Sequence, residues 1–280
     1  MISIIIPLYN KEKFVKRTIK SLLVQTFDKF EVLFIDDGST DKSAQIVESI
    51  QDDRIKLIKK VNGGPSSARN LGVRNAIYDW ILYLDADDCL LPNAIELFVN
   101  YIHKAGNYDC IFGNFFYERN GIKRLYSNYR EGEIKDNFKS FVLGKCMPRT
   151  GVAVFRKKLL LQYPFRENIR RYEDLEQLFR LFKVANFYRI KEPVFIYNSD
   201  GSEAKYKRKN IYEDFLAYIK LEKKCISWEN IALYKLYLLA CDIYPDECAK
   251  LYPKYSKYIV LYFVTRIITN KYSEKLCKIL

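Results

Sequence analysis

The chain has 280 residues, of which 49% are hydrophobic and 29% are charged, and this balance excludes a disordered chain. The net charge of +13 is unevenly spread: residues 1–100 carry 13 Lys and Arg against 14 Asp and Glu, residues 101–200 carry 19 against 11, and residues 201–280 carry 15 against 9. This excess indicates a polyanionic partner, an anionic membrane surface or simply a Lys-rich protein surface. The longest apolar run near the C-terminus, Tyr258 to Val264, is too short for a membrane span, which needs about 20 apolar residues.

The seven cysteines include no CxxC pair and lie mostly among apolar residues, so we expect reduced thiols in a cytoplasmic protein. We expect no signal peptide, because the first predicted strand begins at Ile2. His103 is the single histidine, which argues against a His-based zinc site and against a Ser-His-Asp triad. The protein ligands of any bound metal should therefore be carboxylates.

Strands and helices alternate along the first part of the chain. The predicted strands are residues 2–7, 31–36, 55–59, 80–85 and 109–114, and the predicted helices between them are residues 12–25, 39–50, 67–76 and 92–104. We expect Ser39 or Thr40 to cap the second helix. The alternation predicts an α/β fold with a mostly parallel, doubly wound sheet, in which ligands bind beyond the carboxyl ends of the strands. Polar side chains follow three of these strands: Tyr9, Asn10, Asp36, Asp37, Asp85 and Asp87.

The pattern weakens after residue 115. Residues 119–133 look like a hairpin or an exposed loop, and residues 193–198 form a last predicted strand. Between them, residues 172–185 predict an amphipathic helix whose buried face carries Leu175, Leu178, Phe179 and Phe182. Beyond Lys209 the sequence becomes helical, basic and aromatic.

Three acidic residues crowd the end of the fourth predicted strand. Asp85, Asp87 and Asp88 follow directly after the hydrophobic stretch that ends at Leu84. Two carboxylates spaced two positions apart can hold one divalent cation together, and Mg²⁺ and Mn²⁺ prefer oxygen ligands that include substrate phosphates. The alternatives are a solvated acidic turn, or an N-cap formed by Asp88 ahead of the helix that Pro92 opens.

Several short segments occur together in a specific order: "IIPLYN", "IDDGSTD", "NGGPSSARN" and "YLDADD" within the first 115 residues, then "RRYEDLEQLFRL" at residues 170–181. In this combination the sequence resembles the family 2 glycosyltransferases of GT-A fold that build bacterial surface polysaccharides. The resemblance implies a GT-A catalytic domain at residues 1–205, with a nucleotide-binding half at about 1–115 and an acceptor half at about 116–205. Residues 206–280 would form a helical C-terminal region.

The resemblance also implies roles in binding a nucleotide diphosphate sugar. Tyr9 would pack on the base, next to Pro7, and Asp37 would accept a hydrogen bond from the uracil N–H. Asp36 would support Asp37, or be purely structural. The backbone at Gly63 and Gly64 would approach the nucleotide closely.

Four further residues would complete the donor site. Arg69 would contact the ribose or the phosphates, and Asn70 would brace its loop. Asp87 would bind Mn²⁺ or Mg²⁺ at the phosphates. Asp85, next to Ala86, would contact the ribose or support the metal ligands.

The "YED" segment at residues 172–174 resembles the motif that precedes the acceptor helix in the family. Asp174 would be the general base that takes the proton from the acceptor hydroxyl, and Glu173 would hydrogen-bond the donor sugar or the backbone. A single displacement would invert the anomeric centre. The alternative is a pair of acids that only complement the helix dipole.

One departure from the family pattern follows this helix. Many relatives carry a histidine that contacts phosphate or metal, and the corresponding position here is Asp200. Lys205, Lys207 or Arg208 could serve the diphosphate instead, or a loop could close over the site there.

The basic C-terminal region has two interpretations. It forms helices that pack on the catalytic domain, or it lies on the inner face of a cell membrane, with Tyr and Phe at the interface. In the second case the enzyme would be cytoplasmic and peripherally attached. The basic side chains that anionic lipids would attract are Lys254, Lys257, Arg266, Lys271, Lys275 and Lys278.

We therefore expect a metal-dependent hexosyltransferase that uses a nucleotide diphosphate sugar, most simply a UDP-sugar, and a glycan or lipid-linked acceptor. A nucleotidyltransferase that makes a nucleotide sugar is one alternative, but it should show a glycine-rich phosphate loop after the first strand, where "PLYNKEKF" has no glycine. A nucleic-acid-binding protein is the other, but the motif-rich residues 1–100 are net acidic, so we expect no nucleic-acid partner.

Overall fold

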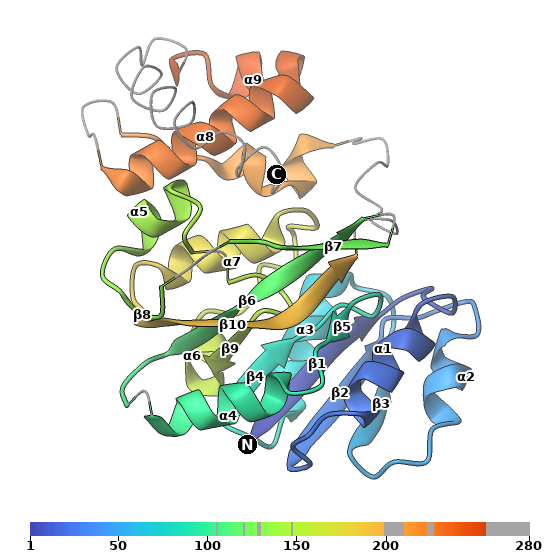
Figure 1. Cartoon of the computed structure of the whole chain (residues 1–280). Helices are drawn as coiled ribbons and strands as arrows, with labels where there is room; N and C mark the ends of the chain where they lie inside the picture. The colour runs from blue at the N-terminus through green and yellow to red at the C-terminus, as the bar shows by residue number, and fades with distance from the viewer. Residues whose placement is uncertain are drawn as a thin grey trace.

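The computed structural model describes residues 1–104, 106–119, 121–127, 130–146, 148–198, 210–222 and 227–255. Its centre is one sheet with the strand order β3-β2-β1-β4-β9-β6-β10-β5, to which β7 adds beside β6 and β8 beside β10 (Figure 1). The strands are β1 (Ile2–Leu8), β2 (Phe30–Asp36), β3 (Ile55–Lys59), β4 (Trp80–Tyr83), β5 (Cys89–Leu90), β6 (Cys110–Arg119), β7 (Ile122–Leu125), β8 (Gly132–Ile134), β9 (Ala153–Arg156) and β10 (Phe187–Asn198).

The sheet has a parallel half and a mixed half. Strands β3, β2, β1 and β4 run parallel to one another, as the sequence predicts for the nucleotide-binding half. Strand β9 is inserted antiparallel between β4 and β6, whereas β6 and β10 pair in parallel. The predicted α/β class is confirmed, and the carboxyl ends of β1, β2 and β4 meet along one edge of the sheet.

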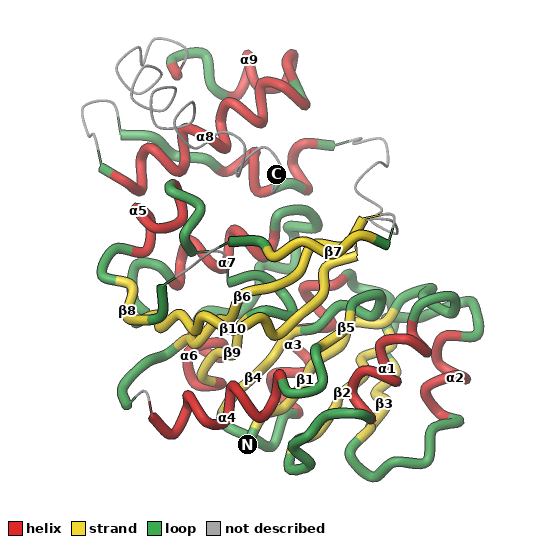
Figure 2. Tube along the Cα trace, in the orientation of Figure 1, coloured by secondary structure: helices red, strands yellow, loops and turns green. Residues whose placement is uncertain are grey.

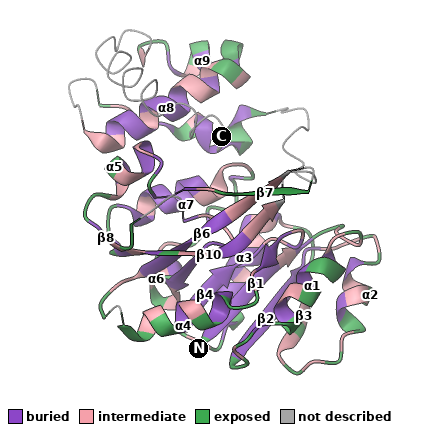
Figure 3. Cartoon of the chain, in the orientation of Figure 1, coloured by how far each residue is buried: buried purple, intermediate pink, exposed green. Residues whose placement is uncertain are grey.

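Helices cover both faces of this sheet (Figure 2). One apolar core contains buried residues of α1 (Val15–Leu23), α2 (Ser43–Glu48) and α4 (Ala94–Lys104). The other core contains buried residues of α3 (Pro65–Asn75), α5 (Asn137–Val142), α6 (Lys157–Gln162) and α7 (Glu173–Leu181). Figure 3 shows the buried strands between these two helical layers.

Strand β1 illustrates how the sequence creates two cores. Ile4 and Ile6 belong to the core beneath α1, and Ile5, which points the other way, belongs to the core beneath α3. Helix α3 lies unusually close to this strand, because a Cβ atom at Gly72 would stand only 2.3 Å from Cγ2 of Ile5. The glycine therefore sets the distance between the strand and the helix that carries Arg69.

Most predicted elements are present, and the errors are local. The predicted hairpin appears as the antiparallel pair β6 and β7, and the predicted apolar face of α7 is buried. The predicted cap of α2 by Ser39 or Thr40 is wrong, because α2 begins at Ser43. Instead, Ser39 Oγ accepts from the backbone N–H of Asn10 (3.1 Å), and Thr40 N–H donates to Asn10 Oδ1 (2.8 Å).

A helical region follows the last strand. The described elements are the 3₁₀ segments η2 (Ile211–Glu213) and η3 (Phe215–Tyr218) and the helices α8 (Trp228–Ile243) and α9 (Pro245–Leu251). Their buried residues share one apolar core with those of α5 and α7, so the described part of this region packs on these two helices. Among the described helices, none is long and apolar enough to cross a membrane. Of the basic side chains expected at a membrane, Lys254 is described and the other five lie outside the described residues.

Candidate active site

The polar residues predicted to bind a nucleotide follow neighbouring strands of the parallel half. Tyr9 comes after β1, Asp37 after β2 and Asp85 after β4, and these strands are adjacent in the order β2-β1-β4. The ring of Tyr9 is 48% exposed, so it is accessible for packing against a planar group. Pro7 lies within β1 opposite Ile35 and is half-buried.

Asp37 is the centre of a hydrogen-bonded cradle. Its Oδ1 accepts from Lys60 Nζ (2.6 Å) and from Gly63 N–H (2.9 Å), and its Oδ2 accepts from Gly64 N–H (2.7 Å). Gly64 has φ of +87°, a left-handed conformation that favours glycine. The carboxylate thus holds the 60–64 loop in its fold. A carboxylate can accept roughly four hydrogen bonds, and Asp37 accepts these three, so one position remains on Oδ2. Asp36 plays a smaller part, as its Oδ1 accepts from Ser39 N–H (3.2 Å).

Arg69 connects the predicted donor site to the predicted base. One of its terminal nitrogens contacts Asp85 Oδ1 (2.9 Å), and the other contacts Glu173 Oε1 (2.8 Å), although Glu173 lies 104 residues further along the chain. Burial acts to lower the pKa of the guanidinium, but the two carboxylates outweigh it and raise this pKa. The sequence-predicted residues of both halves therefore meet in one charged cluster.

The pKa values of the two acids in this cluster are shifted in opposite directions. Burial acts to raise the pKa of Asp85, but the charge of Arg69 and the hydrogen bond from Thr150 Oγ1 (3.1 Å) bring it below its usual value. Burial and the neighbouring charge of Asp174 raise the pKa of Glu173 to about 7, against the attraction of Arg69. Near neutral pH, Glu173 can therefore exist as a carboxylic acid that donates a hydrogen bond.

The carboxylates of the predicted metal motif point to different cations. Asp85 pairs with Arg69, whereas Asp87 Oδ2 pairs with Lys11 Nζ (2.9 Å). These two cations supply positive charge beside the acidic cluster. Ala86 between them is buried, and its carbonyl accepts from Thr18 Oγ1 (2.8 Å), which fixes the turn.

A divalent ion fits this motif only if the substrate completes its coordination. No group of three His, Cys, Asp or Glu side chains suited to a metal occurs among the described residues. Asp87 is partly exposed and its Oδ1 accepts no hydrogen bond from the described residues. One carboxylate together with phosphate oxygens and waters is a usual environment for Mg²⁺ or Mn²⁺, so the donor set is compatible with a nucleotide-bound metal.

Asp88 does not cap helix α4, contrary to one of the alternatives above. Helix α4 begins at Ala94, too far along the chain for Asp88 to cap it. Asp88 is buried, and its N–H donates to the carbonyl of Asp85 (3.1 Å), which closes the turn after β4.

The predicted base lies at the start of α7, beside a small cavity. Asp174 lines this cavity of about 20 Å³ together with Tyr83, Arg149 and Thr150, and its Oδ1 accepts from the N–H of Leu175 (2.8 Å).

Tyr172 precedes this acid pair with a φ of +51°. Asn10, beside Tyr9, is the other non-glycine residue with positive φ in the described part of the chain. Such strained residues cluster at functional sites, and both of these flank the predicted site.

Arg149 was not identified by sequence reasoning. Its guanidinium lies 4.1 Å from the ring centre of Tyr197, lowers the pKa of Asp85 and lines the cavity with Asp174. Among the described residues no carboxylate is within ion-pair distance of it, so its N–H groups are available to a ligand. The only signal in the sequence is its position next to Thr150, in a stretch where the element pattern is weak.

Asn70 was predicted to brace its own loop, but its side chain instead holds the segment at Phe165. Its Nδ2 donates to the carbonyl of Phe165 (3.0 Å), and its Oδ1 accepts from the N–H of the same residue (2.9 Å). Asn70 thereby ties α3 to the loop that leads toward α7. Asp200, at the position of the missing histidine, and the predicted substitutes Lys205, Lys207 and Arg208 lie outside the described residues.

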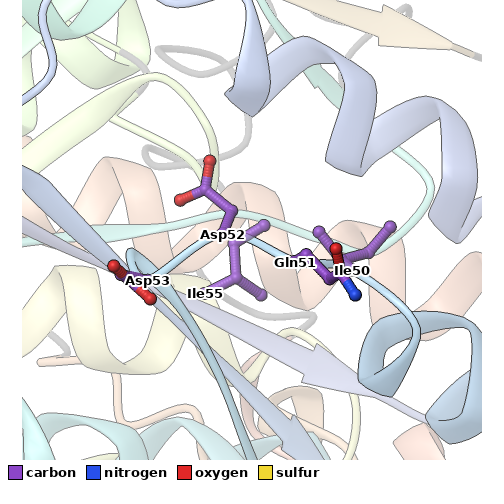
Figure 4. Close-up of a pocket in the computed structure, with 5 residues that line it drawn as sticks. All are labelled: Ile50, Gln51, Asp52, Asp53 and Ile55. Carbon is purple, nitrogen blue, oxygen red and sulfur yellow. The ribbon is translucent and has the colours of Figure 1, made fainter.

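A second, open hollow lies away from this cluster. Ile50, Gln51, Asp52, Asp53 and Ile55 line it, on the loop before β3 and at the start of that strand (Figure 4). It is therefore at the amino end of β3, not at the carboxyl edge of the sheet. The carboxylate of Asp52 is occupied by Arg54, with contacts of 2.9 and 2.7 Å, so this hollow offers little for ligand chemistry.

Comparison with known proteins identifies the family. The sequence model described as "Glycosyl transferase family 2" matches residues 3–167, which include the 60–64 loop, Arg69 and the metal motif. The chain belongs to glycosyl transferase family 2. The matched range ends before Glu173 and Asp174, so the sequence model does not cover the acid pair.

Two curated relatives match very different shares of their own length. An uncharacterized glycosyltransferase of Rickettsia conorii is 37% identical over 175 residues, which are 62% of this chain but only 28% of the relative. A GalNAc(5)-diNAcBac-PP-undecaprenol beta-1,3-glucosyltransferase of Campylobacter jejuni is 28% identical over 99% of this chain and 97% of its own length. The second relative therefore matches the helical C-terminal region as well.

Solved structures support the fold. The structure of Staphylococcus aureus TarS residues 1–349 in complex with UDP has a TM-score of 0.64 at 21% identity, over 98% of this chain and 91% of the TarS chain. The complex of TarS with UDP-GlcNAc has the same TM-score at 18% identity and covers 94% of this chain and 72% of that chain. The glycosyltransferase thus has the GT-A fold.

Proposed function

We propose that this family 2 glycosyltransferase moves a hexose from a UDP-sugar to a glycan or lipid-linked acceptor, with inversion at the anomeric carbon. The observation that carries the proposal is the bridge of Arg69 between Asp85 and Glu173, because it joins the nucleotide-binding rim to the acid pair. The name of the Campylobacter relative, a glucosyltransferase acting on an undecaprenol-linked glycan, supports this substrate class, and so do the UDP complexes of TarS.

In the proposed reaction, the carboxylate of Asp174 accepts the proton of the acceptor hydroxyl. The acceptor oxygen forms its bond to the anomeric carbon as the bond to the diphosphate oxygen breaks, and the electron pair leaves with UDP. Glu173, with its pKa near 7, donates a hydrogen bond to a hydroxyl of the donor sugar. Asp37 accepts a hydrogen bond from the uracil N–H through the remaining position on Oδ2, and Tyr9 packs on the base.

Three cationic groups complete the proposed site. A Mn²⁺ or Mg²⁺ ion held by Asp87 and the phosphates would stabilise negative charge on the leaving diphosphate. Lys11, which contacts Asp87, lies where it can also approach that charge. Arg149, stacked on Tyr197 beside the cavity that Asp174 lines, is placed to donate hydrogen bonds to the sugar or to the acceptor.

The proposal is tested by nucleotide release from a panel of UDP- and GDP-sugars with Mn²⁺. We expect release of UDP from one UDP-hexose, abolition of release by EDTA, and losses of about 100-fold or more in Asp87→Ala and Asp174→Asn. Asp53→Ala, in the remote hollow, is the matched control and should keep wild-type activity. Equal turnover by wild type and Asp87→Ala, or turnover of GDP-sugars alone, would contradict the proposed roles.

We also propose that the basic C-terminal region contacts an anionic membrane surface, where a lipid-linked acceptor would reside. The uneven distribution of charge supports this idea, since residues 201–280 carry 15 Lys and Arg against 9 Asp and Glu. Flotation with vesicles containing phosphatidylglycerol should recover the protein with the vesicles. Equal recovery with neutral vesicles would contradict an electrostatic attachment.

A further inference from the structure

The C-terminal region contacts the segment that carries the acid pair. Residues 165–172, here called the base loop, connect α6 to Glu173 and Asp174. On one side, α3 holds this loop through Asn70 and through Ser66 Oγ, which donates to the carbonyl of Ile169 (3.1 Å). On the other side, the loop is held by residues 210–218, which lie beyond the range that the family model matches.

The contacts on this second side are made by backbone. The N–H groups of Arg170 (2.8 Å) and Arg171 (3.2 Å) donate to the carbonyl of Glu213, and the N–H of Phe215 donates to the carbonyl of Arg171 (3.1 Å). Arg171 and Asp214 thus form an isolated parallel β-bridge. A side-chain contact accompanies them, since Asn168 Nδ2 donates to Tyr218 Oη (3.3 Å).

Tyr172 explains why this bridge matters for the acid pair. It directly follows the bridged residue Arg171, has left-handed backbone angles, and directly precedes Glu173. A tyrosine holds such a conformation only where the surrounding structure enforces it. The bridge fixes the chain on the N-terminal side of Tyr172, and helix α7 fixes it on the C-terminal side. The orientation of the side chains of Glu173 and Asp174 therefore depends on both.

Asp214 organises the C-terminal side of the bridge. It is fully buried, its Oδ1 accepts from Leu216 N–H (3.2 Å), and its Oδ2 accepts from Tyr244 Oη (3.2 Å) at the junction of α8 and α9. The carboxylate therefore connects the two terminal helices to the strand-like contact at Arg171. A buried carboxylate with these partners holds one geometry, because each lost hydrogen bond would leave a polar group unsatisfied.

We propose that Asp214 is a positioning residue for the transfer reaction: through its backbone bridge to Arg171 it holds Glu173 and Asp174 in their reactive orientation. The proposal rests on the proposed function for its catalytic consequence. The C-terminal helices accordingly support the acid pair through this contact, from outside the site itself. Loss of this contact should reduce turnover while the nucleotide-binding rim, built from other elements, keeps its affinity for UDP.

A matched pair of buried tyrosines provides the test. Tyr244 Oη donates to Asp214, whereas Tyr252 Oη donates to the carbonyl of Leu216 (2.6 Å) and accepts from the N–H of Ile219 (3.1 Å), with no hydrogen bond to Asp214. Tyr244→Phe and Tyr252→Phe remove one hydroxyl each from comparably buried rings. We expect Tyr244→Phe to lower kcat for UDP release about tenfold, with KM for the donor and Kd for UDP within twofold of wild type, and to shift the pH profile of kcat. Tyr252→Phe should change none of these.

Hydrogen–deuterium exchange provides a readout that does not depend on activity. Amides of the base loop and of the first turn of α7 should exchange faster in Tyr244→Phe than in Tyr252→Phe, and Asp214→Asn should lie between wild type and Tyr244→Phe. Equal exchange and equal kcat in the two tyrosine variants would overturn the proposal. A wild-type protein that binds UDP but turns over no nucleotide sugar would instead refute the proposed function, and the exchange comparison would still decide whether Asp214 positions the acid pair.

Discussion

Replacing Arg69 with methionine should destabilise the protein in a way that depends on pH. Arg69 is buried and contacts both Asp85 and Glu173, so its removal leaves two carboxylates without their shared cation. Breaking a buried pair by removing one partner costs on the order of 3 kcal/mol. The cost here should lie below that value, because Asp85 is more than one-third exposed and can be hydrated. The cost should be smallest at low pH, where Glu173 can take up a proton.

The pH dependence follows from Glu173. Its pKa in the wild type is about 7, raised from the usual 4.5, so the stability that its protonation contributes is present at low pH and is lost as pH rises through 7. Without Arg69 this pKa rises further, and the folded variant still holds the proton at pH 8. Since one proton over one pH unit corresponds to about 1.36 kcal/mol, the destabilisation of Arg69→Met relative to wild type should grow by about 1.4 kcal/mol between pH 6 and pH 8.

Urea unfolding at pH 6, 7 and 8, followed by the fluorescence of Trp80 and Trp228, would measure this difference. Arg54→Met is the matched control, because it breaks the ion pair with Asp52, whose pKa is lowered by the hydrogen bond from Arg54 and which does not titrate in this range. A destabilisation of Arg69→Met that stayed constant from pH 6 to pH 8, or that decreased, would refute the assignment of a raised pKa to Glu173.

Three further predictions concern the elements that support the site. Gly72→Ala should destabilise the protein by about 1–3 kcal/mol, measured by thermal unfolding, because the new methyl group would collide with Ile5. Asn70→Asp should cost about 2 kcal/mol, since the carbonyl of Phe165 loses its donor, and should increase proteolysis of the base loop. Asp37→Asn should weaken UDP binding at least tenfold in calorimetry, because an amide can satisfy fewer of the loop donors and presents N–H groups where the carboxylate accepts.

A control variant checks the first of these predictions, and a contrary outcome is defined for each of the other two. Arg74→Ala changes an exposed position of the same helix as Gly72 and should leave stability within about 0.5 kcal/mol of wild type. For Asn70→Asp, unchanged proteolysis would mean that the loop is held by its other contacts alone. For Asp37→Asn, unchanged UDP affinity would remove Asp37 from the nucleotide site and leave it the structural role of folding the 60–64 loop.

The sequence alone determined the α/β class, the two-sided burial of the first strands and the edge at which polar residues gather. The physical reason is local: β-branched runs and helical periodicity each report their own segment, and parallel strands place their carboxyl ends together. Asp37 and Asp85 could be predicted as candidates because they lie directly beside recognisable strand ends, and Gly64 and Arg69 because their segment resembles a family motif. The short elements β5, β9 and α6 were missed, because they carry too few residues for a period to appear.

Only the tertiary structure decided which of these residues act on one another. That the carboxylates of Asp85 and Asp87 point to Arg69 and Lys11 depends on contacts across 16 and 76 residues of sequence, which no local pattern encodes. The same holds for Arg149, whose position is set by stacking on Tyr197, and for Asp214, whose bridge to Arg171 joins distant parts of the chain. A side chain's partners are fixed by packing of the whole fold, and their charges then set the pKa values on which the proposed chemistry relies.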